Sequence, residues 1–448
     1  MKVVSGGKGS SQVDPDLVAS LFPSVPDFIQ HRMTRVAAEA HEMYLPAVEV
    51  GGVRPAKAHR DPAAADVVPT EVFARMDRIV TSDFKTLKEG VDYDKIHGTG
   101  YKDGKGSFRT VSFMLPEPIQ VGNHTIYAVR LKGVAFDPSN LDREFDLLRM
   151  QAEVMGWKVP SRAVRMDWYI DEAGKVVQTP HVNEPLGGGF LSETLGEARA
   201  HRRCLNGGED VDYPLNWYEY DPSIVPPNGL RLGAMAVGLT SPSRLYTGAV
   251  IGNLSEEYDP VVSKGDMSVI DEWREKTHAV FLAYVRRLAR WHRRDDAAGK
   301  EGFYHESPHP GQFYFAHDNW ERIASAPAGE RMIAADLLNV EPLTEMPYAQ
   351  KIGCIALDLK SMLAYAGRYD SYPLFNQRGF DFMSVAMQYF DGVDDRFLLD
   401  QLASFSKIGQ SGRPAIENLF QLSAERKRPI IEFGDNPLVK ALKMQYPE

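Results

Sequence analysis

Two histidines and a glutamate stand close together in the segment FYHESPHPGQFYF, residues 303–315. From His305 to His309 the segment matches H-E-x-x-H, in which two histidines bind zinc and the glutamate acts as a general base. This chemistry requires a helix, because positions i and i+4 share a helix face and bring both imidazoles to one metal. Pro308 lies between the histidines and Pro310 follows them. Proline inside a helix costs about 3 kcal/mol or more, so the pattern predicts an irregular loop, and a zinc-dependent hydrolase is the less favoured alternative.

A long predicted helix, residues 268–294, leads into this loop with the sequence SVIDEWREKTHAVFLAYVRRLARWHRR. Side chains suited to a buried face recur in it at steps of three and four, which is typical of an amphipathic helix. They are Val269, Ile270, Trp273, Thr277, Val280, Phe281, Tyr284, Leu288 and Trp291. After the loop, the short apolar run RMIAADLLN contains Asp336, and most of the remaining sequence has helical periodicity.

Strand-like sequence dominates before this helix. Residues 124–133, HTIYAVRLKG, alternate in polarity and carry Lys132 near their end, and residues 191–208 are predicted to form a helix that contains Glu197. A glycine-rich segment, residues 95–114, precedes the lysine strand and is typical of a hairpin. Its glycines, which permit close approach of backbone N–H groups to a phosphate, are Gly98, Gly100, Gly104 and Gly106. Strand-rich sequence followed by helix-rich sequence predicts an α+β fold with two unlike lobes.

The loop and its neighbours resemble the catalytic region of aminoglycoside-phosphotransferase-like kinases. That family carries H-G-D-L-H-P-G-N followed by a hydrophobic residue, after a helix that ends in L-x-x-L-H. Four positions match in place, namely His305, His309, Pro310 and Gly311. The segment LARWH, residues 288–292, is similar to the end of the family's helix. Asp336 stands where the family carries a metal-binding aspartate, and Asp358 lies on a helix that resembles the one supporting the loop from below.

The lysine strand resembles the same superfamily. YAVRLKG, residues 127–133, is similar to the strand whose lysine binds the α- and β-phosphates of ATP. It also resembles the L-K-G-x-G of the selenoprotein O family, a kinase-fold group that transfers AMP. The resemblance implies that Lys132 binds phosphate and that Glu197 orients it through an ion pair. It further implies that His305 braces the loop and that the Mg²⁺ of bound ATP is held by Gln312 and Asp336.

Three positions depart from the family pattern. Ser307 replaces the catalytic aspartate, Gln312 replaces the metal-binding asparagine, and Glu306 replaces a small residue. Serine cannot act as a carboxylate base at neutral pH, whereas glutamine keeps an amide oxygen for Mg²⁺. Selenoprotein O-like enzymes also lack this aspartate and still use nucleotide. The predicted reaction is therefore transfer of an adenylyl or phosphoryl group from ATP to an unknown acceptor, and a noncatalytic nucleotide-binding pseudokinase module is the alternative.

The resemblance implies a two-lobed protein-kinase-like fold of the α+β class, with a strand-rich N-lobe and a helical C-lobe. We expect an N-terminal extension over residues 1–85, an N-lobe with an insertion over residues 86–245, and a C-lobe over residues 246–448. Within the extension, residues 51–69, GGVRPAKAHRDPAAADVVP, are typical of a linker.

Composition limits the possible partners and location. The 448-residue chain has a net charge of −10 and only two cysteines, which excludes a disulfide framework and a four-cysteine zinc site. The acidic balance and the lack of a basic run disfavour nucleic acid as a partner. Without a signal-peptide pattern or an 18-residue apolar run, we expect a cytoplasmic protein that does not enter membranes. The expected partners are ATP and an unknown protein, peptide or small-molecule acceptor.

Overall fold

The computed structural model of the chain describes residues 56–81, 110–134, 164–170, 176–182, 189–221, 232–241, 245–262, 264, 267–295, 297, 299–305, 308–315, 332–338, 340–407, 430–431 and 437–448. The glycines of the expected phosphate-binding hairpin, Gly98, Gly100, Gly104 and Gly106, lie outside these residues. Ser307 also lies outside them. The roles expected for these five residues stay predictions.

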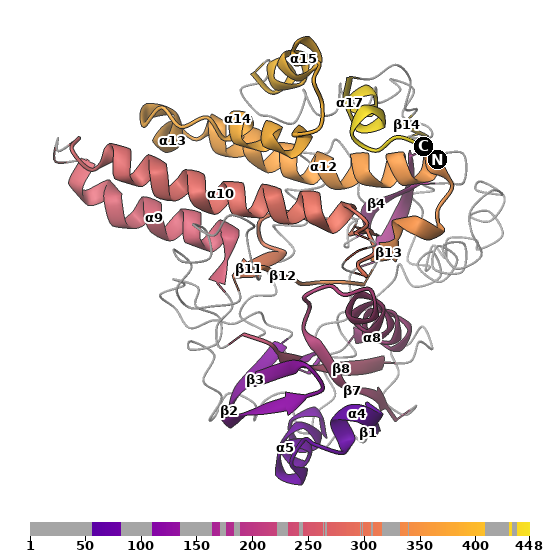
Figure 1. The fold of residues 1–448 in the computed structure, drawn as a ribbon. Helices are drawn as coiled ribbons and strands as arrows, with labels where there is room; N and C mark the ends of the chain where they lie inside the picture. The colour runs from indigo at the N-terminus through magenta and orange to yellow at the C-terminus, as the bar shows by residue number, and fades with distance from the viewer. Residues whose placement is uncertain are drawn as a thin grey trace, which may run out of the picture.

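A six-stranded antiparallel sheet dominates the N-terminal part of the structure (Figure 1). Its strands are β1 (Ala56–Arg60), β2 (Thr110–Val121), β3 (His124–Lys132), β6 (Gly189–Phe190), β7 (Tyr213–Tyr220) and β8 (Leu232–Leu239). The order in space is β1-β7-β8-β3-β2, and β6 pairs with β8. Gly122 has a φ of +58° in the two-residue turn from β2 to β3, a conformation that strains residues with a Cβ. In this order β3, which carries Lys132, lies between β8 and β2 and is an interior strand of the sheet.

Alternation along β3 gives the sheet two different faces, because successive strand side chains point to opposite sides. Val129 and Leu131 are buried in a core shared with α4 (Pro62–Ala65) and α5 (Thr70–Thr81). On the other face, Ala128 packs with apolar residues of β8 and with α8 (Leu191–Asn206). Lys132 belongs to this second face, so its side chain extends toward α8.

Residues 56–81 belong to the sheet half of the molecule, whereas the sequence suggested a linker within an N-terminal extension. Strand β1 pairs antiparallel with β7, from Ala56 opposite Tyr220 to Arg60 opposite Asn216. Helix α5 buries Phe73, Met76 and further apolar residues against the sheet. The Ala-, Pro- and Gly-rich composition misled the prediction, because the pairing partner of β1 lies about 160 residues further along the chain.

Helices form the second half of the molecule (Figure 1). They are α9 (Thr247–Val262), α10 (Ile270–His292), α12 (Tyr348–Ser371), α13 (Pro373–Gln377), α14 (Phe382–Ala386), α15 (Arg396–Lys407) and α17 (Pro437–Gln445), with short 3-10 helices η2 (Leu343–Glu345) and η3 (Met387–Phe390). The predicted stripe of α10 is buried in a large apolar core, with Trp273, Phe281 and Leu288 fully covered. The two halves thus have separate cores, and the fold class is α+β as expected.

Short strands complete the structure. A three-stranded sheet in the order β12-β11-β9 joins β9 (Leu245–Tyr246), β11 (Phe313–Phe315) and β12 (Met332–Ala334). Strand β10 (Phe303–Tyr304) pairs with β13 (Glu341–Pro342), and a further sheet contains β4 (Val164–Ile170), β5 (Val176–Val182) and β14 (Ile430–Ile431). In Figure 1 the β11–β12 pair lies between the helices and the six-stranded sheet. Among the helices of the described ranges, none has the length and apolar character needed to cross a membrane.

Candidate functional site

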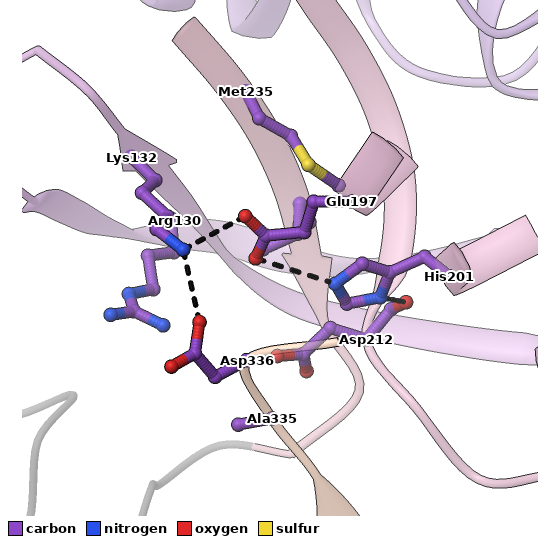
Figure 2. A pocket seen from close by; sticks show the side chains of 9 residues that line it. Arg130, Lys132, Glu197, His201, Asp212, Met235, Ala335 and Asp336 are labelled. Carbon is purple, nitrogen blue, oxygen red and sulfur yellow. Dashed lines mark hydrogen bonds and ion pairs between the residues drawn. The ribbon is translucent and has the colours of Figure 1, made fainter. Parts of the chain in front are cut away.

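Lys132 joins two carboxylates that come from distant parts of the chain (Figure 2). Its Nζ lies 2.8 Å from Oε2 of Glu197 on α8 and 3.1 Å from Oδ1 of Asp336, just after β12. The partners are 65 and 204 residues away in sequence. The ion pair between Lys132 and Glu197 expected from the sequence is therefore present, and Asp336 lies beside it.

The two contacts of Lys132 differ in their access to solvent. The Lys132 and Glu197 side chains are 21% and 11% exposed, whereas the Asp336 side chain is 50% exposed. Charge attraction is screened least where water is excluded, so the Glu197 contact holds the lysine more firmly. The Asp336 contact is open to water and can be exchanged for a ligand. This geometry presents an oriented ammonium group beside a solvent-facing carboxylate.

Asp336 has a left-handed backbone conformation, with a φ of +58°. Among the described residues it is the only residue other than glycine with positive φ. This conformation is sterically unfavourable for residues with a Cβ, although aspartate and asparagine tolerate it better than most. Such strain in a native structure often accompanies a functional site. The turn places the Asp336 carboxylate between Lys132 and Gln312.

Gln312 lies directly across from this turn. Its backbone carbonyl accepts a hydrogen bond from the Ala335 N–H at 2.8 Å, and its side-chain Nε2 donates to Oδ2 of Asp336 at 3.0 Å. A carboxylate and an amide side by side provide oxygen ligands of the kind that Mg²⁺ prefers, with the remaining positions left to water and phosphate. These two residues contain such oxygens, although the Gln312 amide directs its nitrogen to Asp336, and the metal role expected for them stays a prediction. In the described part of the chain, no group of three or more His, Cys, Asp or Glu side chains is placed to bind a metal ion.

His305 connects the loop to Ala335, next to Asp336, and to Asp358 of α12. Its Nε2 lies 2.9 Å from the carbonyl oxygen of Ala335, and its backbone N–H donates to Oδ2 of Asp358 at 2.7 Å. Because a carbonyl oxygen only accepts, the proton of the imidazole is on Nε2. Burial lowers the pKa of His305, which keeps the ring neutral. His305 thus positions Ala335 and, through it, the neighbouring Asp336.

Helix α10 also supports the loop, once through Asp358 and once directly. The buried Asp358 of α12, which binds the His305 N–H, also lies 3.0 Å from Nε2 of His292 at the end of α10. The Tyr284 hydroxyl, also on α10, donates to the carbonyl oxygen of Pro308. The described loop residues 305 and 308–311 lie outside helices and strands and are held by buried partners, which is what positioning of a reactive side chain requires.

The two histidines of the H-E-x-x-H match do not share a helix. Strand β10 ends at Tyr304, and residues 308–311 form an irregular turn. Nδ1 of His309 accepts a hydrogen bond from the Gly311 N–H at 3.0 Å, and the ring stacks on Tyr365 at a centroid distance of 5.2 Å. His305 is instead directed to the Ala335 carbonyl. The geometry that a helical zinc-hydrolase motif requires is absent from these described residues.

Three residues that sequence reasoning missed lie beside Lys132, namely Arg130, His201 and Asp212 (Figure 2). They line one pocket together with Lys132, Glu197, Met235, Val237, Ala335 and Asp336. His201 Nδ1 donates to the backbone carbonyl of Asp212 at 2.8 Å, and His201 Nε2 lies 4.0 Å from Glu197. The spacing of four between Glu197 and His201 was the available signal, since such helical neighbours share a face. Burial lowers the pKa of His201.

Asp212 connects the sheet half to the short strands beneath it. Its carboxylate accepts a hydrogen bond from the hydroxyl of Tyr314 on β11. The adjacent Val211 forms an isolated parallel bridge with Ala334 of β12. These contacts secure the strands that carry Gln312 and Asp336 against the sheet that carries Lys132. The site is therefore built across both halves of the molecule.

Comparisons with known proteins give little further information. No protein-family model and no curated protein sequence matches the chain. A search of solved structures found the structure described as "WaaP in complex with acyl carrier protein", at 12% sequence identity and a TM-score of 0.26. The match covers 58% of this chain and 90% of the other. Function is therefore inferred from the geometry of this chain's own residues.

Proposed function

We propose that the chain binds ATP with Mg²⁺ in the pocket between Lys132 and Asp336 and transfers part of it to an acceptor, as an atypical kinase-like enzyme. The observation that supports this most is the single ammonium group between Glu197 and Asp336. Positioned cations and metal-binding carboxylates are the main requirements of phosphoryl-transfer sites. A two-lobed kinase-like architecture agrees with a pocket that is lined by residues of the six-stranded sheet, of α8 and of the turn after β12.

Each residue of the site would have a separate role in binding ATP and Mg²⁺. Lys132 would contact phosphate oxygens, and Glu197 would keep its ammonium group in the pocket. Gln312 and Asp336 would hold Mg²⁺, which neutralises phosphate charge when it is bound. His305 would position the Asp336 turn through Ala335. Each role depends on a contact between residues that the fold brings together from separate elements.

Two transfer reactions are compatible with this site. In phosphoryl transfer, an acceptor oxygen forms a bond to the γ-phosphorus and ADP leaves with the bridging electrons. In adenylyl transfer, the acceptor attacks the α-phosphorus and pyrophosphate leaves. Because Ser307 cannot serve as the carboxylate base of ordinary kinases, the acceptor requires no such base or the attack occurs at the α-phosphate. A noncatalytic nucleotide-binding module is the second candidate, and the same serine is the observation that favours it.

Nucleotide binding is tested by thermal unfolding of the full chain with ATP and either Mg²⁺ or Mn²⁺. A ligand that binds only the native state raises the melting temperature. We expect this rise in the wild type, a loss of it in Lys132→Met, and a loss of its metal-dependent part in Asp336→Ala, which removes the oxygen ligands. Lys440→Met, which changes an exposed lysine on the distant helix α17, is the matched control. An unchanged melting temperature of the wild type at millimolar ATP contradicts the proposal.

The transferred group is identified with ATP labelled at the α- or the γ-phosphate, incubated with a panel of protein, peptide and small-molecule acceptors. Incorporation of the α label alone indicates adenylyl transfer, and incorporation of the γ label alone indicates phosphoryl transfer. Binding of ATP without incorporation of either label favours the noncatalytic module.

A further inference from the structure

Arg130 is a second cation in the pocket that holds Lys132. The two residues are separated by one position on β3, so their side chains leave the same face of the sheet. Arg130 lies opposite Val237 of β8, and Lys132 lies opposite Met235. All four residues line the pocket. Figure 2 shows the Arg130 and Lys132 side chains extending toward the side of the pocket where Asp336 lies.

The surroundings of Arg130 are unusual for a charged side chain. Ala128, Val237 and Leu239 on this face of the sheet are apolar and buried, and the buried polar Ser112 lies directly opposite Arg130 on β2. A guanidinium group keeps its charge in every protein environment, so its placement beside apolar residues needs anionic groups nearby.

The charge of the pocket makes Arg130 important for an anionic ligand. Lys132 is already in contact with two carboxylates, Glu197 and Asp336. Asp212 adds a third carboxylate to the lining. The lining holds two cations, Arg130 and Lys132, against these three carboxylates. Arg130 therefore supplies half of the positive charge with which the lining can meet an anionic ligand.

We propose that Arg130 is a phosphate-binding residue that acts beside Lys132 and gives the site a preference for polyphosphates over monophosphates. This inference rests on the proposed function and identifies the part of the ligand that Arg130 recognises. Two positions along a strand span roughly 7 Å, so the two cations meet different phosphate groups of one chain. The planar guanidinium can bind two phosphate oxygens at once, which an ammonium group cannot do.

The test is calorimetric titration of the full chain with ATP, ADP, AMP and inorganic tripolyphosphate, each with Mg²⁺. For the wild type we expect affinity to rise from AMP to ATP. Arg130→Gln should lower the affinity for ATP and for tripolyphosphate by about tenfold or more, as expected for loss of charged hydrogen bonds. The affinity for AMP should be nearly unchanged. Arg130→Lys keeps the positive charge but cannot bind two phosphate oxygens at once, so its affinity for ATP should lie between those of the wild type and Arg130→Gln. Arg78→Gln on the outer helix α5 removes an exposed arginine and is the matched control.

The outcomes separate this inference from the proposed function. Equal affinity of wild type and Arg130→Gln for ATP and tripolyphosphate overturns the inference and leaves nucleotide binding intact. Arg130-dependent binding of tripolyphosphate without any preference for ATP supports the inference and contradicts the nucleotide site. A wild type that binds none of these compounds contradicts both. If Arg130→Gln does not fold, Arg130→Lys provides the test. An affinity of Arg130→Lys for ATP equal to that of the wild type would then contradict phosphate recognition by the guanidinium group.

Discussion

Asp336 combines a strained backbone with a position in the candidate site, and the two properties can be measured separately. Its φ of +58° favours glycine, while its carboxylate contacts Lys132 and Gln312. Asp336→Gly and Asp336→Ala both remove the carboxylate, but only alanine retains a Cβ. We therefore expect the glycine variant to be more stable than the alanine variant by about 1 kcal/mol, measured by urea unfolding without ligand.

The same two variants also test function at this residue. Both should lose the metal-dependent part of the stabilisation by ATP, because neither supplies an oxygen ligand. A glycine variant that is no more stable than the alanine variant would contradict the assignment of strain. Metal-dependent stabilisation that survives in both would contradict the assignment of Asp336 as a metal ligand.

Glu341 makes the stability of the chain depend on pH. Burial raises the pKa of Glu341 from 4.5 to about 7, and the neighbouring charge of Glu345 adds to the rise. The pKa of Glu341 is therefore higher in the folded protein than in the unfolded chain. Between pH 4.5 and about 7 the folded protein holds a proton on Glu341 that the unfolded chain has lost. The stability linked to this proton is fully present below pH 4.5 and is lost as pH rises through about 7.

Glu341→Gln imitates the protonated side chain and removes this dependence. At pH 8 we expect the variant to be more stable than the wild type, by up to about 3 kcal/mol for a shift of this size, and the difference should shrink toward zero near pH 5. Glu345→Gln should move the transition of the wild-type residue to lower pH. Denaturant unfolding across this range is the measurement, and a difference that is the same at pH 5 and pH 8 would be inconsistent with a buried, titrating Glu341.

At the scale of elements, α12 supports the loop through Asp358. This carboxylate is fully buried and binds both the His305 N–H and the His292 ring. Asp358→Ala leaves both groups buried without this partner, so we expect a loss of about 2–6 kcal/mol, at about 1–3 kcal/mol for each unsatisfied group. Asp381→Ala removes a carboxylate that only caps α14, and should cost about 1 kcal/mol.

The loop anchor also has a consequence for binding. Because His305 positions Ala335 and Asp336, a displaced loop should weaken ATP–Mg²⁺ binding even in variants that remain folded. Asp358→Asn, which keeps the size of the side chain, is suited to this measurement by calorimetry. Stability and ATP affinity that both remain at wild-type values in Asp358→Asn would show that α12 does not control the loop.

At the scale of the whole molecule, a buried chain of hydrogen bonds connects the C-terminal segment to the loop. The Tyr446 hydroxyl lies 2.6 Å from the Tyr389 hydroxyl, which lies 2.6 Å from Nδ1 of His292. His292 in turn contacts Asp358, the partner of His305. Helix α17 and the segment after it are therefore structurally coupled to an element more than 130 residues earlier in the chain.

Removal of the central hydroxyl should disturb this chain of contacts. Tyr389→Phe leaves His292 Nδ1 and the Tyr446 hydroxyl without their shared partner, and we expect a loss of about 1–3 kcal/mol. Tyr372→Phe, which removes an exposed hydroxyl bound to Arg368, should change stability much less. Thermal and urea unfolding distinguish the two, and equal effects would indicate that the buried chain contributes nothing specific.

The elements that carry the site were largely predictable from sequence. The alternation of residues 124–133 and the helical spacing of residues 268–294 are local signals, and they correspond to β3 and α10. The contact between Lys132 and Glu197, which are 65 positions apart, was predicted from family resemblance, because nothing in the sequence between them indicates it. The linker expected within residues 51–69 was wrong where β1 forms, since a strand at the sheet edge depends on its partner β7.

The sequence by itself determined the periodicity of the main helices and strands. It also determined that His305 and His309 do not share a helix, because Pro308 and Pro310 exclude one. These properties depend on neighbouring residues and backbone sterics alone. Only the tertiary structure decided which charges meet in the pocket, since Arg130 and Asp212 carry no distinguishing local pattern, and the helical spacing of His201 from Glu197 does not show that it reaches the pocket. It also decided the left-handed turn at Asp336. Such features arise from contacts between residues far apart in the chain, which outweigh local preference once the core has formed.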